Sequence, residues 1–378
     1  MSDSQLNVLL LSGDFEVRGS SAYTLRLAEH LTAYDVKPRV ICPDARMVGA
    51  DKLADLPITV YGQMNFPVLR RLVMELIRRD LLSDVPDLIH IQSRNVLWQG
   101  AWLARRLRRP FVLTVHDSLQ PREHLTLNRR WGERIITVSD SVKAELIGHT
   151  NMSEDRVTVI HSGVESSAEN GLRVLDPNHV PVVGTAGPLE AVKGLPFFLG
   201  AAQRVLAAHK DVEFLVSGAG PEEGNLRRLA RDLEISEHVT FVPNLHDFGA
   251  SIAAMDIFCL PSLRQGLGTI MLEAMLLGKP VIASGVGGVY SVVRDRETGL
   301  VVPPSDSEQL AQKILELLND PVKARAMAES GQRFVQEEFS VANMVSQTVD
   351  VYRQVVEQSA AGVRTGQAAD ENHVESET

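Results

Sequence analysis

Short apolar runs alternate with longer segments of helical periodicity along most of the chain. In the first half the runs are Asn7–Ser12, Arg39–Cys42, Leu88–Ile91, Phe111–Val115, Arg134–Val138 and Val157–Ile160. In the second half they are Val182–Ala186, Phe214–Ser217, Val239–Val242, Asp256–Leu260, Val281–Ala283 and Gly299–Pro303. Apolar runs separated by amphipathic helices are typical of βαβ units on parallel sheets. The pattern therefore predicts an α/β protein.

The polar segment Glu165–His179 lacks periodicity and separates the two series, which predicts an interdomain linker. We expect one Rossmann-like domain over residues 1–170 and a second over residues 171–339. A final helical pattern covers residues 340–358. The remaining residues, 359–378, are rich in Ala, Gly, Gln and acidic side chains, and we expect them to be disordered.

Length and charge narrow the class of protein. A chain of 378 residues is long for one core, so about two domains are expected. The net charge of −10 argues against a nucleic-acid-binding protein, which would carry a basic excess. Cys42 and Cys259 lie in apolar runs without metal-ligand spacing, which favours a reducing compartment. No signal peptide and no apolar stretch of about 20 residues is visible, so a cytoplasmic location is expected.

Residues 67–82 form a basic amphipathic pattern, with four arginines among Leu, Val, Met and Ile. Such a helix can lie on an anionic membrane surface, which would make the protein peripheral at the inner face of the cytoplasmic membrane. Such a helix more often packs one face on a sheet and exposes the other to solvent. Both interpretations stay open at this point.

The segment Pro261–Gly288 carries the clearest chemistry. An apolar strand ends at Pro261, a loop with Gly266, Leu267 and Gly268 follows, and a helix begins near Thr269. A glycine-rich loop at a helix N-terminus offers unpaired N–H groups and a favourable dipole to an anion. Glu273, about one turn into the helix, is placed to accept hydrogen bonds from vicinal hydroxyls. Together these features suggest a nucleotide sugar, although an ordinary capped turn would have the same glycines.

The same segment resembles the signature of the retaining GT-B glycosyltransferases of family four, PS-x-x-E-G-x-G-x-x-x-x-E-A-M. Glu273 matches the second Glu, whereas Gln265 stands in place of the first. The resemblance extends from about Leu6 to Gln358. It implies a GT-B fold, in which two Rossmann-like domains face each other across a cleft and the 340–358 helix crosses back to the first domain.

The resemblance also implies site residues. His116, in a TVHD-like motif, would lie beside the donor sugar. Gly19 stands in the family's glycine pair near the donor phosphates, and Gly187 and Lys193 match a G-R-L…K-G pattern in which Pro188 replaces the Arg. The loop of Pro243 and Asn244 would touch the nucleobase. Plain alternatives exist for several of these: a Ser-capped turn at Gly19, a polar strand cap at His116 and a surface lysine at Lys193.

We therefore expect a glycosyltransferase that moves a sugar from a nucleotide-diphosphate sugar to an acceptor hydroxyl with retention, in the synthesis of a cell-envelope polysaccharide, lipopolysaccharide or glycolipid. Its catalytic residues would be His116, Lys193, Gln265 and Glu273. No Asp-x-Asp occurs in the sequence, and no metal or other cofactor is expected. Two alternatives remain, a nucleotide-binding partner subunit with little activity and a GT-B sugar-nucleotide epimerase. Gln265 retains the carbonyl of the usual Glu and loses its charge, which would slow an enzyme without silencing it.

Overall fold

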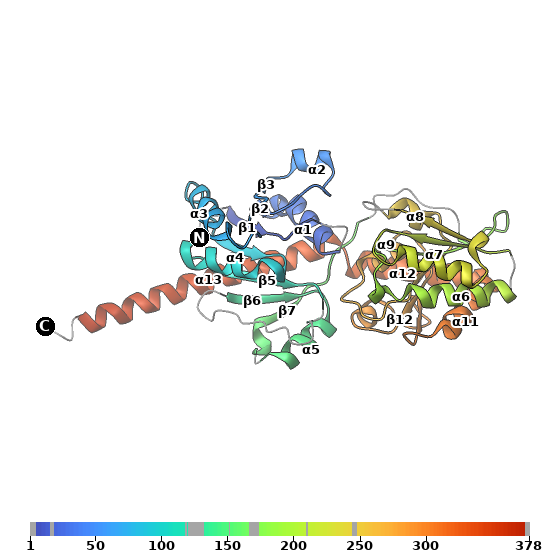
Figure 1. Ribbon diagram of the computed structural model, residues 1–378. Coiled ribbons are helices and arrows are strands. Elements are labelled where there is room, and N and C mark those ends of the chain that lie inside the picture. The colour runs from blue at the N-terminus through green and yellow to red at the C-terminus, as the bar shows by residue number, and fades with distance from the viewer. Residues whose placement is uncertain are drawn as a thin grey trace.

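The computed structural model describes residues 5–15, 19–117, 119, 132–150, 152–165, 174–208, 211–243 and 248–374. Two lobes lie side by side, and each is built on a parallel sheet flanked by helices (Figure 1). The first sheet has the order β3-β2-β1-β4-β5-β6-β7 and the second β10-β9-β8-β11-β12-β13. The predicted α/β class with two Rossmann-like domains is confirmed.

The strands follow the predicted apolar runs closely. In the first sheet they are β1 (Leu6–Leu11), β2 (Val36–Cys42), β3 (Ile58–Val60), β4 (Leu88–Ile91), β5 (Phe111–Val115), β6 (Gly132–Thr137) and β7 (Val157–Val159). In the second they are β8 (Val182–Ala186), β9 (Glu213–Ser217), β10 (Val239–Val242), β11 (Ile257–Leu260), β12 (Val281–Ser284) and β13 (Leu300–Val302). The sequence analysis missed only β3, because this edge strand has three residues and half-exposed side chains.

The helices of the first lobe are α1 (Gly19–His30), α2 (Ala50–Asp55), α3 (Arg70–Leu81), α4 (Leu97–Leu107) and α5 (Asp140–His149). Those of the second are α6 (Leu195–Ala208), α7 (Glu223–Asp232), α8 (Gly249–Ala253), α9 (Thr269–Leu276), α10 (Val289–Val292), α11 (Ser307–Leu318) and α12 (Pro321–Glu338). The last helix, α13, spans Val341–Val374.

Both faces of the first sheet are buried, which explains why its strands are continuously apolar. In β1, Val8 and Leu10 pack into the cluster formed with α1 and α13, whereas Leu9 and Leu11 pack into the cluster formed with α3 and α4. Successive side chains of a strand point to opposite faces, so one strand serves both layers.

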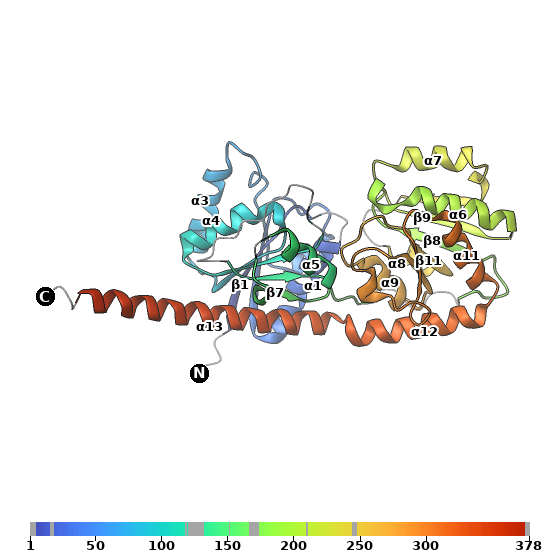
Figure 2. The same ribbon diagram turned by 90° about the horizontal axis from the view of Figure 1, so that it is seen from below.

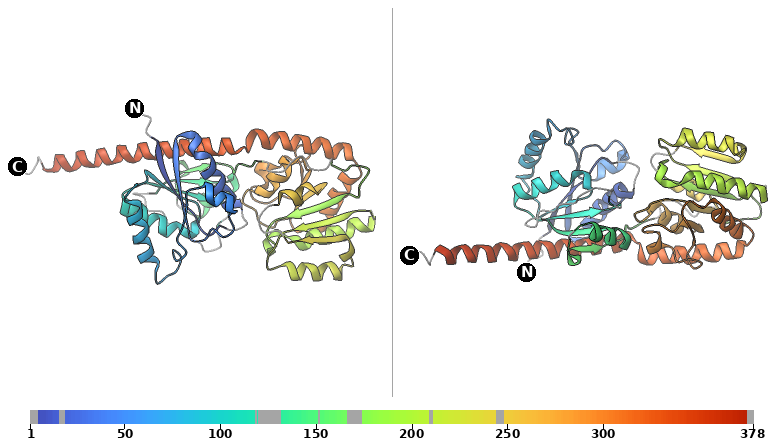
Figure 3. Two further views of the ribbon diagram at one scale, coloured as in Figure 1. Left: turned by 90° about the horizontal axis from the view of Figure 1, so that it is seen from above. Right: turned by 60° about the horizontal axis from the view of Figure 1, so that its bottom comes forward.

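Helix α13 begins beside the second lobe and packs on the first. Figures 2 and 3 show α12 and α13 running in succession along one side of the two lobes. Val345, Tyr352 and Val355 of α13 are buried in the core of the first lobe. Tyr352 also makes a buried hydrogen bond of 2.5 Å with His90 Nδ1 on β4.

The sequence analysis placed the end of this helix at residue 358 and expected disorder over residues 359–378. The predicted end at residue 358 is wrong, because α13 continues to Val374. Four alanines, the strongest helix formers, lie among residues 359–374. Extending an existing helix also needs no new nucleus, so composition alone did not reveal the continuation.

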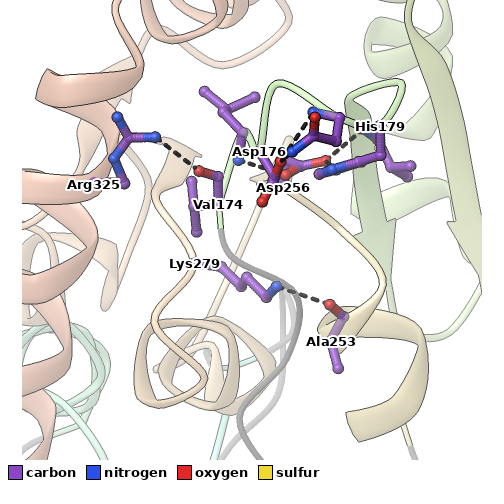
Figure 4. Close-up of polar contacts among 10 residues, drawn as sticks. Val174, Asp176, His179, Ala253, Asp256, Lys279 and Arg325 are labelled. Carbon is purple, nitrogen blue, oxygen red and sulfur yellow. Dashed lines mark hydrogen bonds and ion pairs between the residues drawn. The ribbon is translucent and has the colours of Figure 1, made fainter.

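The chain enters the second lobe along a segment that is fixed by the buried Asp256 (Figure 4). Its Oδ1 accepts a hydrogen bond of 2.6 Å from the N–H of Leu175, and its Oδ2 accepts bonds from the N–H of Val182 and from His179 Nε2 at 2.9 and 2.8 Å. Arg325 on α12 donates to the carbonyl of Val174 at 3.2 Å. This end of the predicted linker is therefore attached to the second lobe. The predicted boundary at 170/171 lies outside the described residues.

Candidate active site

Loops of the two lobes meet where strands of both sheets end. A Cβ built on Gly19, at the start of α1, would lie 2.2 Å from Thr269 Oγ1 at the start of α9. A Cβ on Gly266 would lie 2.2 Å from the carbonyl oxygen of His116, just after β5. The segments that follow β1, β5 and β11 therefore converge, as expected of a ligand site at the carboxyl ends of parallel strands.

The glycines between β11 and α9 are required by the backbone. Gly268, with φ of +88°, takes a left-handed conformation that favours glycine, and it is the N-cap residue of α9. A Cβ on Gly288 would lie 1.8 Å from the carbonyl oxygen of Gly266, so two loops touch through their backbones. The N–H groups of Thr269 and Ile270 precede the first hydrogen bond of α9, in which Met271 donates to the carbonyl of Gly268 at 2.8 Å. This arrangement suits an anionic group.

The side chain of Lys193 contacts the loop between β11 and α9. Lys193 ends a 3-10 turn, Ala191–Lys193, and its Nζ donates to Gln265 Oε1 at 3.2 Å. The hydroxyl of Ser262 donates to the same oxygen at 3.1 Å. The side-chain carbonyl of Gln265 is thus oriented by two donors, one of them cationic. A small pocket beside these groups is lined by Gly187, Pro188, Lys193 and Ser262, among others.

His116 lies at the carboxyl end of β5, as predicted. Its ring packs edge-on against Tyr23, with ring centroids 5.0 Å apart. Its Nε2 is buried and makes no hydrogen bond to the residues that the structure describes. Burial lowers the pKa of His116 to about 4, although Asp117 and a hydrogen bond to the backbone of Gln92 act in the opposite direction. At neutral pH this histidine is therefore uncharged.

Glu273, the predicted hydrogen-bond acceptor for hydroxyl groups, pairs with a residue that the sequence analysis did not single out. Arg26, on α1 of the first lobe, donates from Nη2 to Glu273 Oε1 at 2.8 Å. Both side chains are largely buried, with 12% and 25% of their area exposed. In the sequence Arg26 is one cation within an amphipathic helix, and no local signal distinguishes it from a solvated residue.

Other candidates lie at the edge of this arrangement or outside it. Gly187, with φ of +135°, forms the turn after β8 next to Lys193. Pro243 is exposed after β10, and Asn244 lies outside the described residues. Arg264, in the loop before α9, donates from Nη2 to the carbonyl of Leu119 at 3.2 Å. The first lobe therefore contacts its guanidinium.

No group of three or more His, Cys, Asp and Glu side chains in the part of the chain that the structure describes could hold a metal ion. Over the same residues, no helix is both long and apolar enough to cross a membrane.

Both lobes match families of known proteins. Residues 17–168 match the family described as Glycosyltransferase Family 4, and residues 180–320 match Glycosyl transferases group 1. A phosphatidyl-myo-inositol mannosyltransferase of Mycobacterium leprae is 29% identical over 374 residues, covering 90% of this chain and 94% of the relative. A GDP-mannose-dependent monoacylated alpha-(1-6)-phosphatidylinositol monomannoside mannosyltransferase of Corynebacterium glutamicum is 38% identical over 169 residues, or 42% of this chain and 44% of the relative.

Solved structures agree on the fold. Anabaena HepE, solved in complex with UDP and glucose, superposes with a TM-score of 0.79 at 21% identity, covering 92% of this chain and all of its own. The chain is a glycosyltransferase with the GT-B fold, and each of its lobes matches a glycosyltransferase family.

Proposed function

We propose that the protein transfers a hexosyl residue from a nucleotide-diphosphate sugar to a hydroxyl group of a membrane glycolipid, with retention at the anomeric carbon and without a metal ion. The observation that carries this proposal is the convergence of Lys193, Gln265 and the glycine loop before α9 in one place, with the backbone carbonyl of His116 in the first lobe close to that loop. The second lobe supplies cationic and N–H donors, and we assign the uncharged imidazole of His116 to the donor sugar.

The chemistry follows from these groups. The bond between the anomeric carbon and the diphosphate breaks through an oxocarbenium-like state, and negative charge develops on the leaving phosphate. Fixed donors that meet this charge are the largest catalytic contribution, and we assign that role to Lys193 and to the N–H groups at Gly266–Thr269. The acceptor hydroxyl attacks from the face that the diphosphate leaves, and its proton passes to the leaving phosphate oxygen. Glu273 would hold the ribose hydroxyls, and the loop of Pro243 and Asn244 would border the base.

The names of the relatives guide the choice of donor and acceptor. Both curated relatives described above are mannosyltransferases named for phosphatidylinositol acceptors, and the second is named for GDP-mannose. We therefore place GDP-mannose first among donors and a phosphatidylinositol-type lipid first among acceptors.

The surface of α3 supports a membrane acceptor. Seven apolar side chains at residues 60–82 are exposed, which we call the α3 patch: Val60, Phe66, Val68, Leu69, Leu72, Leu76 and Leu82. The opposite face of α3 buries Val73, Met74, Ile77 and Leu81 in the core. The helix is thus apolar on two faces, and packing on the sheet accounts for only one of them.

The charges beside the α3 patch indicate its partner. Arg71 and Arg79 are exposed on α3 itself, and Arg105 and Arg106 are exposed in the last turn of the neighbouring α4. Apolar side chains among arginines fit an anionic lipid surface, into which such a helix places its apolar face. Helix α3 lies on the side of the first lobe away from the second (Figures 1 and 2). We propose that it docks the protein peripherally on the inner face of the cytoplasmic membrane.

Activity is tested with a panel of GDP- and UDP-sugars, phosphatidylinositol vesicles and EDTA in every reaction. We expect a glycolipid product with retained anomeric configuration, formed at the same rate with and without chelator. Tight nucleotide binding without transfer to any acceptor, including lipids extracted from the source cells, would contradict the proposed transferase activity. Activity lost in EDTA and restored by Mg²⁺ or Mn²⁺ would contradict the role of Lys193.

Membrane docking is tested by sedimentation with vesicles of equal parts phosphatidylglycerol and phosphatidylcholine. The variant Leu72→Ser/Leu76→Ser should reduce the bound fraction at least several-fold, because each side chain loses about 1.5–3 kcal/mol of apolar burial on full insertion. The matched control is Val322→Ser, whose side chain is 72% exposed at the start of α12. Equal binding by both variants, or no preference for vesicles with phosphatidylglycerol, would show that the α3 patch is not the membrane-docking surface.

A further inference from the structure

The guanidinium of Arg26 connects three parts of the molecule. It belongs to α1 in the first lobe, it donates from Nη2 to Glu273 on α9 in the second, and it donates from Nη1 to the carbonyl of Gly163 at 3.0 Å. Glu273 is 247 positions away along the chain, and Gly163 is 137 positions away. A planar fork with five N–H donors can serve two acceptors at once, which a lysine cannot do with the same geometry.

Gly163 lies where the two connections between the lobes touch. The next residue, Val164, donates its N–H to the carbonyl of Phe339 at 2.8 Å and forms an isolated bridge with Ser340. A Cβ on Gly163 would lie 2.5 Å from the Cα of Val341, the first residue of α13. The chain that leaves the first lobe at Gly163 and Val164 is therefore in contact with the chain between α12 and α13. Any change in the angle between the lobes must pass through these residues.

Glu273 can hold both Arg26 and a ligand. A carboxylate offers about four acceptor positions on its two oxygens, and Arg26 Nη2 uses one of them on Oε1. The other positions suit the vicinal hydroxyls of a ribose. A hydrogen bond between charged groups that are mostly buried also limits the rotation of the carboxylate, which prepares it for the ligand.

We propose that Arg26 is a positioning residue that couples occupation of the donor site to the arrangement of the two lobes. This inference rests on the proposed function, since it takes Glu273 as the acceptor of the donor ribose. Arg26 fixes the carboxylate of Glu273 before the donor arrives and ties it to the crossing point at Gly163. Donor binding then favours the closed arrangement in which the first lobe meets the glycine loop.

The experiment compares Arg26→Gln with Lys313→Gln in the full chain. Lys313 forms an ion pair of 2.7 Å with Glu316 at closely similar exposure, 15% and 25%, but within the second lobe alone. The probes are GDP and UDP in calorimetry, the donor KM and kcat, and the radius of gyration by X-ray scattering with and without nucleotide. We expect Arg26→Gln to weaken binding of the preferred nucleotide about 5- to 20-fold, to raise the donor KM similarly, and to change kcat less.

The scattering measurement and the double variant distinguish coupling of donor binding to the arrangement of the lobes from a purely structural role of Arg26. The wild type should become more compact on adding nucleotide, and Arg26→Gln should lose most of this change. Arg26→Gln/Glu273→Gln should bind nucleotide no more weakly than Glu273→Gln alone, because the two side chains act together. Arg26→Lys should lie between wild type and Arg26→Gln, and it replaces Arg26→Gln if that variant does not fold.

Additive effects of the two substitutions, or an Arg26→Gln variant that behaves like Lys313→Gln, would overturn the coupling. The proposed function fails differently: a wild-type protein that binds no nucleotide, or one whose affinity is unaffected by Glu273→Ala, removes the donor assignment itself.

Discussion

The two lobes contribute to the site in different ways. The second lobe contributes a continuous glycine loop, with the left-handed Gly268 and the close contact of Gly288 with Gly266, and the side chains of Lys193, Gln265 and Glu273 beside it. The first lobe contributes contacts across the lobes, from Arg26 on α1 and from the backbone of His116 at the end of β5. A glycine loop is encoded in one continuous segment, because glycine spacing determines where the chain can turn. A contact between the lobes is encoded only by which elements pack together.

This difference explains why the second lobe has the more recognisable sequence. A side chain at Gly266 or Gly288 would collide with neighbouring backbone, and Gly268 has a left-handed φ of +88°, so these positions form a visible pattern. Arg26 stands in ordinary helical backbone on α1, so no local pattern marks it. The following experiments test whether function is distributed as unevenly as the geometry.

The largest effect is expected for Lys193→Met, which removes the cation nearest the proposed leaving group. Because a positioned electrostatic donor contributes about 10²–10³ in rate, kcat should fall by that factor. Release of nucleoside diphosphate from GDP-mannose measures it. Lys323→Met, which removes a lysine paired with Glu316 on the second lobe, is the control. Equal rates for the two variants would show that the backbone alone stabilises the leaving group.

The next effect is expected for Glu273→Ala, which should weaken nucleotide binding by about 1.5–3 kcal/mol, or roughly 10- to 150-fold. The variant loses a charged acceptor and also leaves Arg26 without its partner. Calorimetry with the free nucleotide measures the change. The ribose assignment fails if a folded variant keeps the wild-type dissociation constant.

The first lobe should be the more acid-sensitive one. Burial lowers the pKa of His90 to about 3, whereas an unfolded histidine has a pKa near 6.5. Between these values the unfolded state binds one proton more, so stability falls as pH falls below about 6.5, by about 1.4 kcal/mol per pH unit. Urea unfolding at pH 7, 6 and 5 can be followed by tryptophan fluorescence, because Trp98 and Trp102 lie on α4 of the first lobe.

His90→Gln should remove that part of the pH dependence while its amide still serves Tyr352 and Thr114, the two partners of His90. The exposed His149→Gln is the control and should leave the slope unchanged. The assignment is wrong if His90→Gln keeps the full slope.

The smallest effect is expected for Gln265→Glu, which restores the carboxylate of the family signature. One charge-assisted hydrogen bond exceeds a neutral one by about 1 kcal/mol, so turnover should change by about tenfold or less. Lys193 lies 3.2 Å from Gln265 Oε1 and would also pair with the new charge. Nucleotide affinity should stay nearly constant. A change of several hundredfold in turnover would mean that Gln265 defines a different chemistry.

Much of this protein could be predicted from its sequence. The parallel sheets follow from apolar runs whose residues pack on both faces, and the glycine loop before α9 follows from the pattern of strand, glycines and helix. Local chain geometry dictates these features, so a single segment contains the information. Lys193 was singled out by the resemblance to the family, and its role stays a prediction. The end of α13 was missed because a helix can continue through a polar, alanine-containing stretch once it has been nucleated.

Only the tertiary structure places Arg26 against Glu273 and Gly163, directs Arg264 to Leu119, and leaves the α3 patch exposed. Each of these depends on two surfaces that are far apart in the chain and meet after folding. An amphipathic helix shows from its sequence which residues are apolar, but not which of its faces finds a partner. For that reason the chain itself determined the fold and the glycine loop before α9, and packing between the lobes determined what surrounds them.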